Sequence, residues 1–115
     1  MKRLSSLALL LLVLLNAEAA NGQSLVYVGG EGTAECGAYL EARRQNNEVQ
    51  SYVYATWVHG FLSGYNMATS GATIRTLPSS NTVLAFLDKH CREHPLNLLV
   101  AGAFSLAREL GGTRK

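Results

Sequence analysis

The sequence predicts an all-α protein, a small four-helix bundle with one interhelical disulfide. Apolar residues recur every three or four positions in several successive segments, which is the period of a helix face. Two cysteines, Cys36 and Cys91, fall in two different segments of this kind. Apart from a short apolar stretch at 25–28, no segment has the pattern of a strand, so a doubly wound sheet has nothing to be built from.

The first helix is predicted from Thr33 to about residue 45. Thr33 can cap it, because its hydroxyl can accept a hydrogen bond from an amide of the first turn. Cys36 and Tyr39 fall on one apolar face at helical spacing. The two asparagines that begin at Asn46 end the helix.

The second helix is predicted over 48–69 and is the central helix of the core. Its apolar stripe has a spacing of three or four residues and comprises Tyr54, Trp57, Phe61, Tyr65 and Ala68. Gly60 and Gly64 lie beside this stripe, and each costs up to about 1 kcal/mol relative to alanine in a helix interior. We therefore expect them to allow the close approach of another helix. His59, Ser63 and Asn66 exclude a membrane dimerisation motif here.

A surface connection over 70–78 leads to the third helix, which Ser79 or Ser80 can cap and which ends before Pro95. Pro95 fits the first turn of a fourth helix, where a missing amide hydrogen costs nothing. Gly111 and Gly112 end that helix. Its apolar stripe comprises Leu96, Leu99, Val100, Ala103, Phe104, Ala107 and Leu110.

The first 19 residues have the three parts of a cleavable signal peptide: a basic start, an apolar block over 4–15, and an Ala-x-Ala site that ends at Ala19. A membrane anchor would need about 20 consecutive apolar residues, and this block is shorter. We expect cleavage after Ala19 and a periplasmic or secreted protein, with an uncleaved anchor as the alternative.

The remaining chain divides into a flexible N-terminal arm, 20–32, and one helical domain, 33–112. The arm is rich in glycine around the stretch at 25–28, which predicts either a mobile segment or one short edge strand. Cleavage of the signal peptide removes two basic residues and one acidic residue. The mature chain then has eight basic and seven acidic residues and a net charge of +1. So small a charge gives no reason to expect nucleic acid or a membrane surface as a partner.

An even number of cysteines in an exported chain indicates a disulfide, here Cys36 to Cys91. Closing a loop of this length stabilises a small domain by about 4 kcal/mol, which is comparable to its whole stability. Two buried free thiols are the alternative.

Two histidines, His90 and His94, are four residues apart, a spacing that places both rings on one helical face. Zinc normally needs at least three protein ligands, and no clear third ligand is present once Cys91 is assigned to the disulfide. We expect no metal site, and we interpret both as surface histidines near a helix C-terminus, where positive charge is favoured.

Catalytic signatures are absent from the sequence. A Cys-His nucleophile pair is formally available, but a catalytic cysteine must be a free thiolate, which the disulfide removes. No G-x-S-x-G elbow, P-loop or dinucleotide fingerprint occurs. Asp88 and Glu93 stand among basic residues and are expected to form a solvated charged face. The sequence therefore predicts that the protein is not an enzyme and has no catalytic residue and no cofactor.

Three motifs follow one another along the chain. Cys-Gly-x-Tyr-Leu begins at Cys36, W-x-x-G-[FY]-x-[ST]-G-[YF]-N begins at Trp57, and Leu-Asp-x-x-Cys-x-x-x-Pro ends at Pro95. The residues singled out in the last two motifs are Trp57, Gly60, Phe61, Gly64, Tyr65, Asn66 and Pro95. Taken singly, each is explained by core packing, close approach or capping. Together, over 36–110, they resemble the Rap/Tai family of type VI secretion immunity proteins and, more distantly, the HdeA type of acid-stress chaperone.

The two resemblances imply different partners. An immunity protein of this family is periplasmic, often a homodimer, and binds and blocks a cell-wall-degrading amidase delivered by a rival cell. An HdeA-like chaperone is a dimer that opens at low pH and exposes apolar surface to its clients. Opening by acid needs many groups that titrate together, and seven acidic residues are a small supply. The immunity-type inhibitor is therefore the favoured function and the chaperone the alternative, and no residue in contact with a partner can be carried over.

Overall fold

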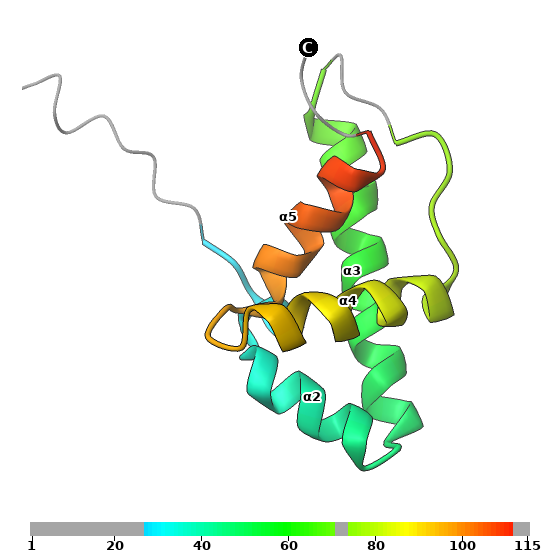
Figure 1. Ribbon diagram of the computed structural model, residues 1–115. Helices are drawn as coiled ribbons and strands as arrows, with labels where there is room; N and C mark the ends of the chain where they lie inside the picture. Colours follow the sequence, from blue (N-terminus) through cyan, green and yellow to red (C-terminus); the bar gives the residue numbers. More distant parts are fainter. Residues whose placement is uncertain (1–26, 71–73, 112–115) are drawn as a thin grey trace, which may run out of the picture.

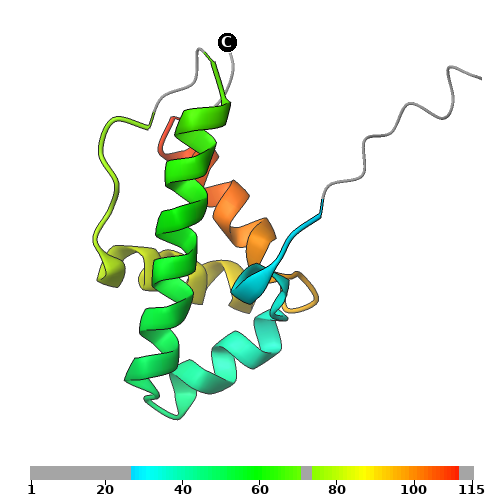
Figure 2. The same cartoon turned by 180° about the vertical axis from the view of Figure 1, so that it is seen from behind.

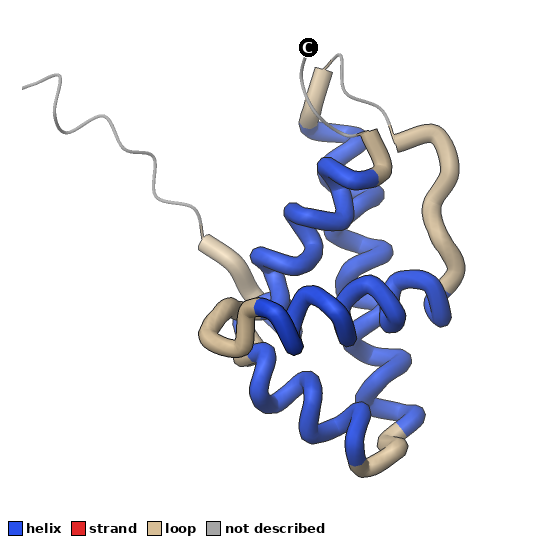
Figure 3. Tube along the Cα trace, in the orientation of Figure 1, coloured by secondary structure: helices blue, strands red, loops and turns tan. Residues whose placement is uncertain are grey.

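A computed structural model describes residues 27–70 and 74–111 of the chain. Over these residues the chain folds into helices joined by turns and loops and forms no strand (Figure 3). The predicted all-α fold with four helices is therefore confirmed. The predicted signal peptide and its cleavage site at Ala19 lie outside the described residues.

Within the described residues, the regular structure consists of one short 3₁₀ helix followed by four α-helices. In chain order these are η1 (Gly30–Thr33), α2 (Cys36–Arg44), α3 (Glu48–Ala68), α4 (Ser80–Glu93) and α5 (Leu99–Glu109) (Figure 1).

The longest helix, α3, is the axis of the fold. α4 crosses it, while α2 and α5 lie toward its two opposite ends (Figure 1). Seen from behind, α3 stands in front of the other helices, with one side uncovered by them (Figure 2). α4 packs against α2, α3 and α5, so its apolar face lies at the centre of the molecule.

All four helices contribute to one hydrophobic core. Burying a single large apolar side chain stabilises the fold by about 1.5 to 3 kcal/mol, so the core is the main source of stability. Its fully buried side chains include Cys36, Tyr39, Val58, Leu62, Val83, Leu87, Cys91 and Leu99.

The predicted apolar stripe of α3 is only partly correct. Tyr54 is buried, but Trp57 and Phe61 are half-buried and Ala68 is exposed. The buried face instead comprises Ser51, Tyr54, Ala55, Val58 and Leu62. α3 has few charged residues on any side, so its sequence does not separate the buried face from the aromatic stripe beside it.

α2 begins later than predicted. Thr33 does not cap it, because its hydroxyl donates to the carbonyl oxygen of Gly30 at 2.9 Å and closes η1. The N-cap is Glu35, and the amide of Cys36 donates to the carbonyl oxygen of Asn97 at 2.9 Å. A backbone group from a distant turn therefore replaces the predicted side-chain cap.

The first part of the chain that the structure describes includes η1, which packs on α3 and α5. The predicted arm, 20–32, thus ends in a helical turn. Tyr27 and Val28 form no strand, and the rest of the apolar stretch at 25–28 lies outside the described residues.

Two predicted caps are confirmed. The Ser79 hydroxyl accepts from the amide of Thr82 at 3.2 Å and begins α4. At the other end of the domain, Gly111 follows α5 with a φ of +87°, the left-handed conformation that glycine adopts most easily after a helix.

Pro95 does not lie in a helix, contrary to the prediction. The amide of Asn97 donates to the carbonyl oxygen of His94 at 3.1 Å, which places Pro95 at the second position of a turn, where its fixed φ is favourable. α5 begins only at Leu99. Leu96, predicted in the apolar stripe, is 96% exposed at the tip of this turn.

None of the helices in the described residues combines the length and the apolar character needed to cross a membrane.

Candidate functional site

An apolar groove lies between α3, α5 and the segment that precedes η1. We call it the aromatic groove. It has a volume of about 220 Å³. Its walls are formed by Tyr27, Val28, Gly29, Trp57, Phe61, Val100 and Phe104.

Trp57 fixes the N-terminal wall of the aromatic groove. Its indole Nε1–H donates to the carbonyl oxygen of Gly29 at 3.0 Å. The ring also packs against η1, where a Cβ atom on Gly32 would come within 2.1 Å of it. Only glycine leaves room there, so Trp57 and Gly32 determine each other's position.

Three aromatic rings that line the groove contact one another. Trp57 stacks on Phe61 with ring centroids 5.7 Å apart, and Phe61 meets Phe104 of α5 edge-on at 4.9 Å. Phe104 is 45% exposed, so part of its ring faces solvent. Tyr65 continues the row, with its ring centroid 6.3 Å from that of Phe61.

Gly60 and Gly64 do not serve the close packing that their spacing predicts. Both are exposed, and a Cβ atom on either would meet no atom within 4 Å. They lie on a side of α3 that no other described helix covers. Close approach occurs instead at Gly102 of α5, where a Cβ atom would come within 2.9 Å of Leu87 and 3.2 Å of His90.

Asn66 closes the α3 end of the connection to α4. Its side-chain oxygen accepts from the amide of Ile74 at 2.8 Å, and its side-chain nitrogen donates to the carbonyl oxygen of Ile74 at 2.9 Å. This pairing satisfies both backbone groups of the buried Ile74. Asn66 therefore has a structural role that its position in the motif did not reveal.

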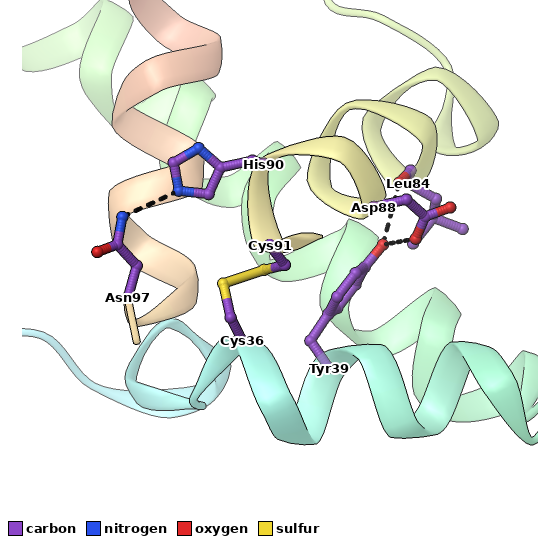
Figure 4. The surroundings of a disulfide bond; sticks show 7 residues. All are labelled: Cys36, Tyr39, Leu84, Asp88, His90, Cys91 and Asn97. Atoms are coloured by element: carbon purple, nitrogen blue, oxygen red, sulfur yellow. Dashed lines mark hydrogen bonds between the residues drawn. A yellow bond between two sulfur atoms is a disulfide. The ribbon is translucent and has the colours of Figure 1, made fainter. Parts of the chain in front are cut away.

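The predicted disulfide is confirmed, and it joins α2 to α4. Cys36 and Cys91 are fully buried, with Cα atoms 5.0 Å apart (Figure 4). Beside it, the amide of Leu99 donates to the carbonyl oxygen of Ala34 at 2.8 Å. The start of α5 is thereby tied to the start of α2.

Asp88 does not belong to a solvated face, contrary to the prediction. Its Oδ1 lies 2.8 Å from the Tyr39 hydroxyl and 2.9 Å from Nε of Arg43 (Figure 4 shows the tyrosine contact). The hydroxyl also lies 3.0 Å from the carbonyl oxygen of Leu84, so two acceptors share its single proton. Burial, together with the hydrogen bond and negative charge of Asp88, raises the pKa of Tyr39 above its ordinary value.

Arg43 completes this cluster from the C-terminal turn of α2. Its hydrogen bond to Asp88 raises the pKa of the guanidinium. The same guanidinium lines a second, polar pocket of about 260 Å³ with Glu48, Ser51, Tyr52, Ser80, Asn81 and Leu84. This pocket could not be predicted from the sequence, because its residues come from three different helices.

His90 is buried, whereas His94 is exposed as predicted for both. The two rings lie with centroids 4.9 Å apart. His90 Nε2 lies 3.3 Å from the side-chain nitrogen of Asn97, across the turn to α5 (Figure 4). Burial, reinforced by the nearby His94, lowers the pKa of His90. Within the residues that the structure describes, no three His, Cys, Asp or Glu side chains gather as metal ligands would.

Of the residues that the motifs single out, the structure brings Trp57 and Phe61 into the aromatic groove. Tyr65 adjoins Phe61 without lining the groove, and the others lie elsewhere. Sequence reasoning missed Val100 and Phe104 as groove residues, since it assigned both to the core stripe of the last helix. It also missed Gly29, whose contribution is a carbonyl oxygen that any residue could supply.

The chain matches no protein-family model, no curated protein and no solved structure in the comparisons made.

Proposed function

We propose that this protein is a small exported binding protein of the immunity type, which inhibits a cell-wall-degrading amidase by binding it. The observation that carries the proposal is the aromatic groove. We propose that it receives an apolar side chain presented by the folded partner enzyme.

The chemistry of the groove suits a protein partner. Interface residues that contribute most to affinity are enriched in tryptophan and tyrosine and lie in preformed apolar pockets. Trp57 is held by a hydrogen bond to Gly29 and by packing over Gly32, so its ring is already ordered before anything binds. An ordered pocket loses little conformational entropy on binding, which favours affinity.

The disulfide supports export. A disulfide between two helices persists in an oxidising compartment and is rare in the reducing cytosol. The predicted signal peptide over 1–19 also indicates export to such a compartment. The resemblance of the motifs to the Rap/Tai family suggests that the partner is a cell-wall amidase.

The test uses the mature protein and each secreted amidase encoded beside its gene. Purified pairs are mixed, and both the dissociation constant and the release of peptide from peptidoglycan are measured. We expect stoichiometric inhibition by at least one such enzyme. If none of them binds, the proposed function is rejected.

Two matched variants test the groove. Phe104→Glu places a charge at the exposed edge of the groove and should weaken binding at least tenfold. Leu96→Glu places the same charge on an exposed leucine outside the groove and should leave the affinity unchanged. Equal affinities for the two variants would show that the partner binds elsewhere.

An acid-stress chaperone is the second candidate. Buried His90 favours it, because protonation of a buried imidazole at mildly acid pH destabilises the folded state. A chaperone should suppress the aggregation of unrelated proteins at acid pH only, whereas an immunity protein should bind one enzyme at neutral pH.

A further inference from the structure

The His90 side chain is buried between the end of α4 and the start of α5. It is 8% exposed, and its ring lies against Gly102, where a Cβ atom would come within 3.2 Å of the imidazole Cδ2. The ring of Phe86, one helical turn earlier, stacks on it with centroids 6.5 Å apart. The imidazole therefore fills a space that the absence of a side chain at Gly102 creates.

The contact with Asn97 defines the neutral form of this ring. An amide nitrogen can only donate, so this contact is a hydrogen bond only in the neutral tautomer in which Nε2 accepts and the ring proton sits on Nδ1. If Nε2 gains a proton, two donors face each other across 3.3 Å. Asn97 must then turn its side chain, or the contact must open.

Asn97 also holds the backbone of this corner. Its amide donates to His94, and its carbonyl oxygen accepts from the amide of Cys36. A turn of the side-chain amide alone would leave these backbone bonds in place, whereas an opening of the contact that displaces Asn97 is transmitted to the turn that positions α5.

We propose that His90 is an acid-sensitive latch: its neutral ring holds the turn between α4 and α5 in place through Asn97 and Gly102, and its protonation releases that turn. Protonation of this one imidazole starts the change, and the segment that shifts is the N-terminal half of α5.

The groups around His90 offer little compensation for its charge. On α4, burial of the ring and the nearby His94 both oppose its protonation, and together they outweigh Glu93, which favours it. On α5 the ring meets Gly102, while the charged residues of that helix, Arg108 and Glu109, lie at its far end. The start of α2 contributes Glu35, which pairs with Leu98 through the backbone.

The sign of the effect follows from linkage. The unfolded chain binds a proton on this histidine near its ordinary pKa of about 6.5, and the folded protein binds it only at lower pH. The stabilisation is complete above that ordinary value and is lost as the pH falls toward the folded pKa. Over this interval the folding equilibrium constant falls by up to about tenfold per pH unit.

The latch also acts on the aromatic groove, because Gly102 lies between Val100 and Phe104 on α5. Phe104 contacts Phe61, and Phe61 stacks on Trp57. A shift of α5 should therefore alter the surroundings of Trp57. A pH-dependent affinity for a partner would follow only if the proposed function is correct, whereas the latch itself is tested on the free protein.

The chain has one tryptophan, so its fluorescence reports on the groove without labelling. The oxidised mature protein is titrated from pH 7.5 to 5.0, above the range in which ordinary carboxyl groups titrate. We expect a sigmoidal change in the emission of Trp57. His90→Gln, which keeps a hydrogen-bonding side chain but cannot titrate, should abolish the change. His94→Gln, the matched control on the same face, should retain it.

An unchanged transition in His90→Gln, or no transition in the wild-type protein, would overturn the proposal. Should His90→Gln fail to fold, NMR of the wild-type protein gives the same decision. The ring signals of His90 and the indole N–H signal of Trp57 should then shift with one common midpoint, and two distinct midpoints would reject the latch.

Discussion

Arg43 and Asp88 form a bidentate ion pair between α2 and α4, with Nε of Arg43 2.9 Å from Oδ1 and its Nη2 3.2 Å from Oδ2. Tyr39 extends the pair, because its hydroxyl also lies within hydrogen-bond distance of Oδ1, at 2.8 Å. α2 is therefore joined to α4 at two places, by the disulfide near its start and by this pair near its end.

Replacing the carboxylate tests this second junction. Asp88→Asn keeps an acceptor for Tyr39 but removes the charge, and both partners retain some contact with solvent. We expect the free energy of unfolding to fall by about 1 to 2 kcal/mol. Glu93→Gln, in the exposed pair with Lys89 on the same helix, should cost less than about 0.5 kcal/mol. Urea denaturation of the two variants makes the comparison, and equal losses would contradict a special role for Asp88.

Tyr39 predicts how stability depends on alkaline pH. Its pKa is raised above the ordinary value of 10.0 in the folded protein, chiefly by burial, so the unfolded chain loses this proton first. The stability contributed by the neutral phenol is complete below pH 10 and is lost as the pH rises above it, by up to about 1.4 kcal/mol per pH unit.

Tyr39→Phe should remove this alkaline loss while lowering stability at pH 7 by about 1 kcal/mol, because a hydrogen bond is lost. Tyr52→Phe, at an exposed position on α3, serves as the control and should leave the alkaline profile unchanged. Parallel profiles for wild type and Tyr39→Phe would refute the assignment.

The sequence predicted the helices and the disulfide because both depend on local or pairwise information. A period of three to four residues is visible in a single segment, and two cysteines allow one intramolecular pair. Helix starts were less predictable, since α2 is capped by the carbonyl oxygen of Asn97, which is far away in the sequence. The β-turn around Pro95 was missed for a different reason. Proline is favoured both at the second position of a β-turn and at the first position of an α-helix, so the residue alone does not decide between them.

The candidate site was predicted less well than the fold. Trp57 and Phe61 stood out as aromatic residues at helical spacing, but nothing local distinguishes a ring at the edge of the core from one inside it. Gly32 and Gly60 illustrate the same limit, because two residues without side chains look alike in a sequence, yet only one of them faces a tryptophan ring. His90 and His94 likewise differ only in what α5 places against them.

Substituting these glycines should give opposite results. Gly60→Ala adds a methyl group where no atom lies within 4 Å and removes the entropic cost of glycine in a helix, so it should stabilise the protein by up to about 1 kcal/mol. Gly32→Ala must displace the ring of Trp57 and should therefore destabilise the protein. It should also change the tryptophan emission, which Gly60→Ala should not do. Thermal unfolding followed by circular dichroism and by fluorescence measures both effects.

The disulfide should account for a large part of the stability. The cysteines are separated by 55 positions, and loop closure of this size corresponds to about 4 kcal/mol. The double variant Cys36→Ser/Cys91→Ser should therefore unfold at much lower denaturant concentration than the oxidised protein. Reduced wild-type protein should resemble the double variant. Mass spectrometry should find both cysteines protected from alkylation until reductant is added, and immediate labelling of the native protein would count against the bond.

The pairing of Cys36 with Cys91 also affects how the chain matures. Because the chain has two cysteines, oxidation within one molecule has a single product, and no incorrect pairing can form that an isomerase would have to reshuffle. Oxidative folding therefore requires an electron acceptor alone. The competing covalent product is a bond between two chains, and since that reaction is bimolecular, its yield depends on how concentrated the unfolded protein is when it meets the oxidant.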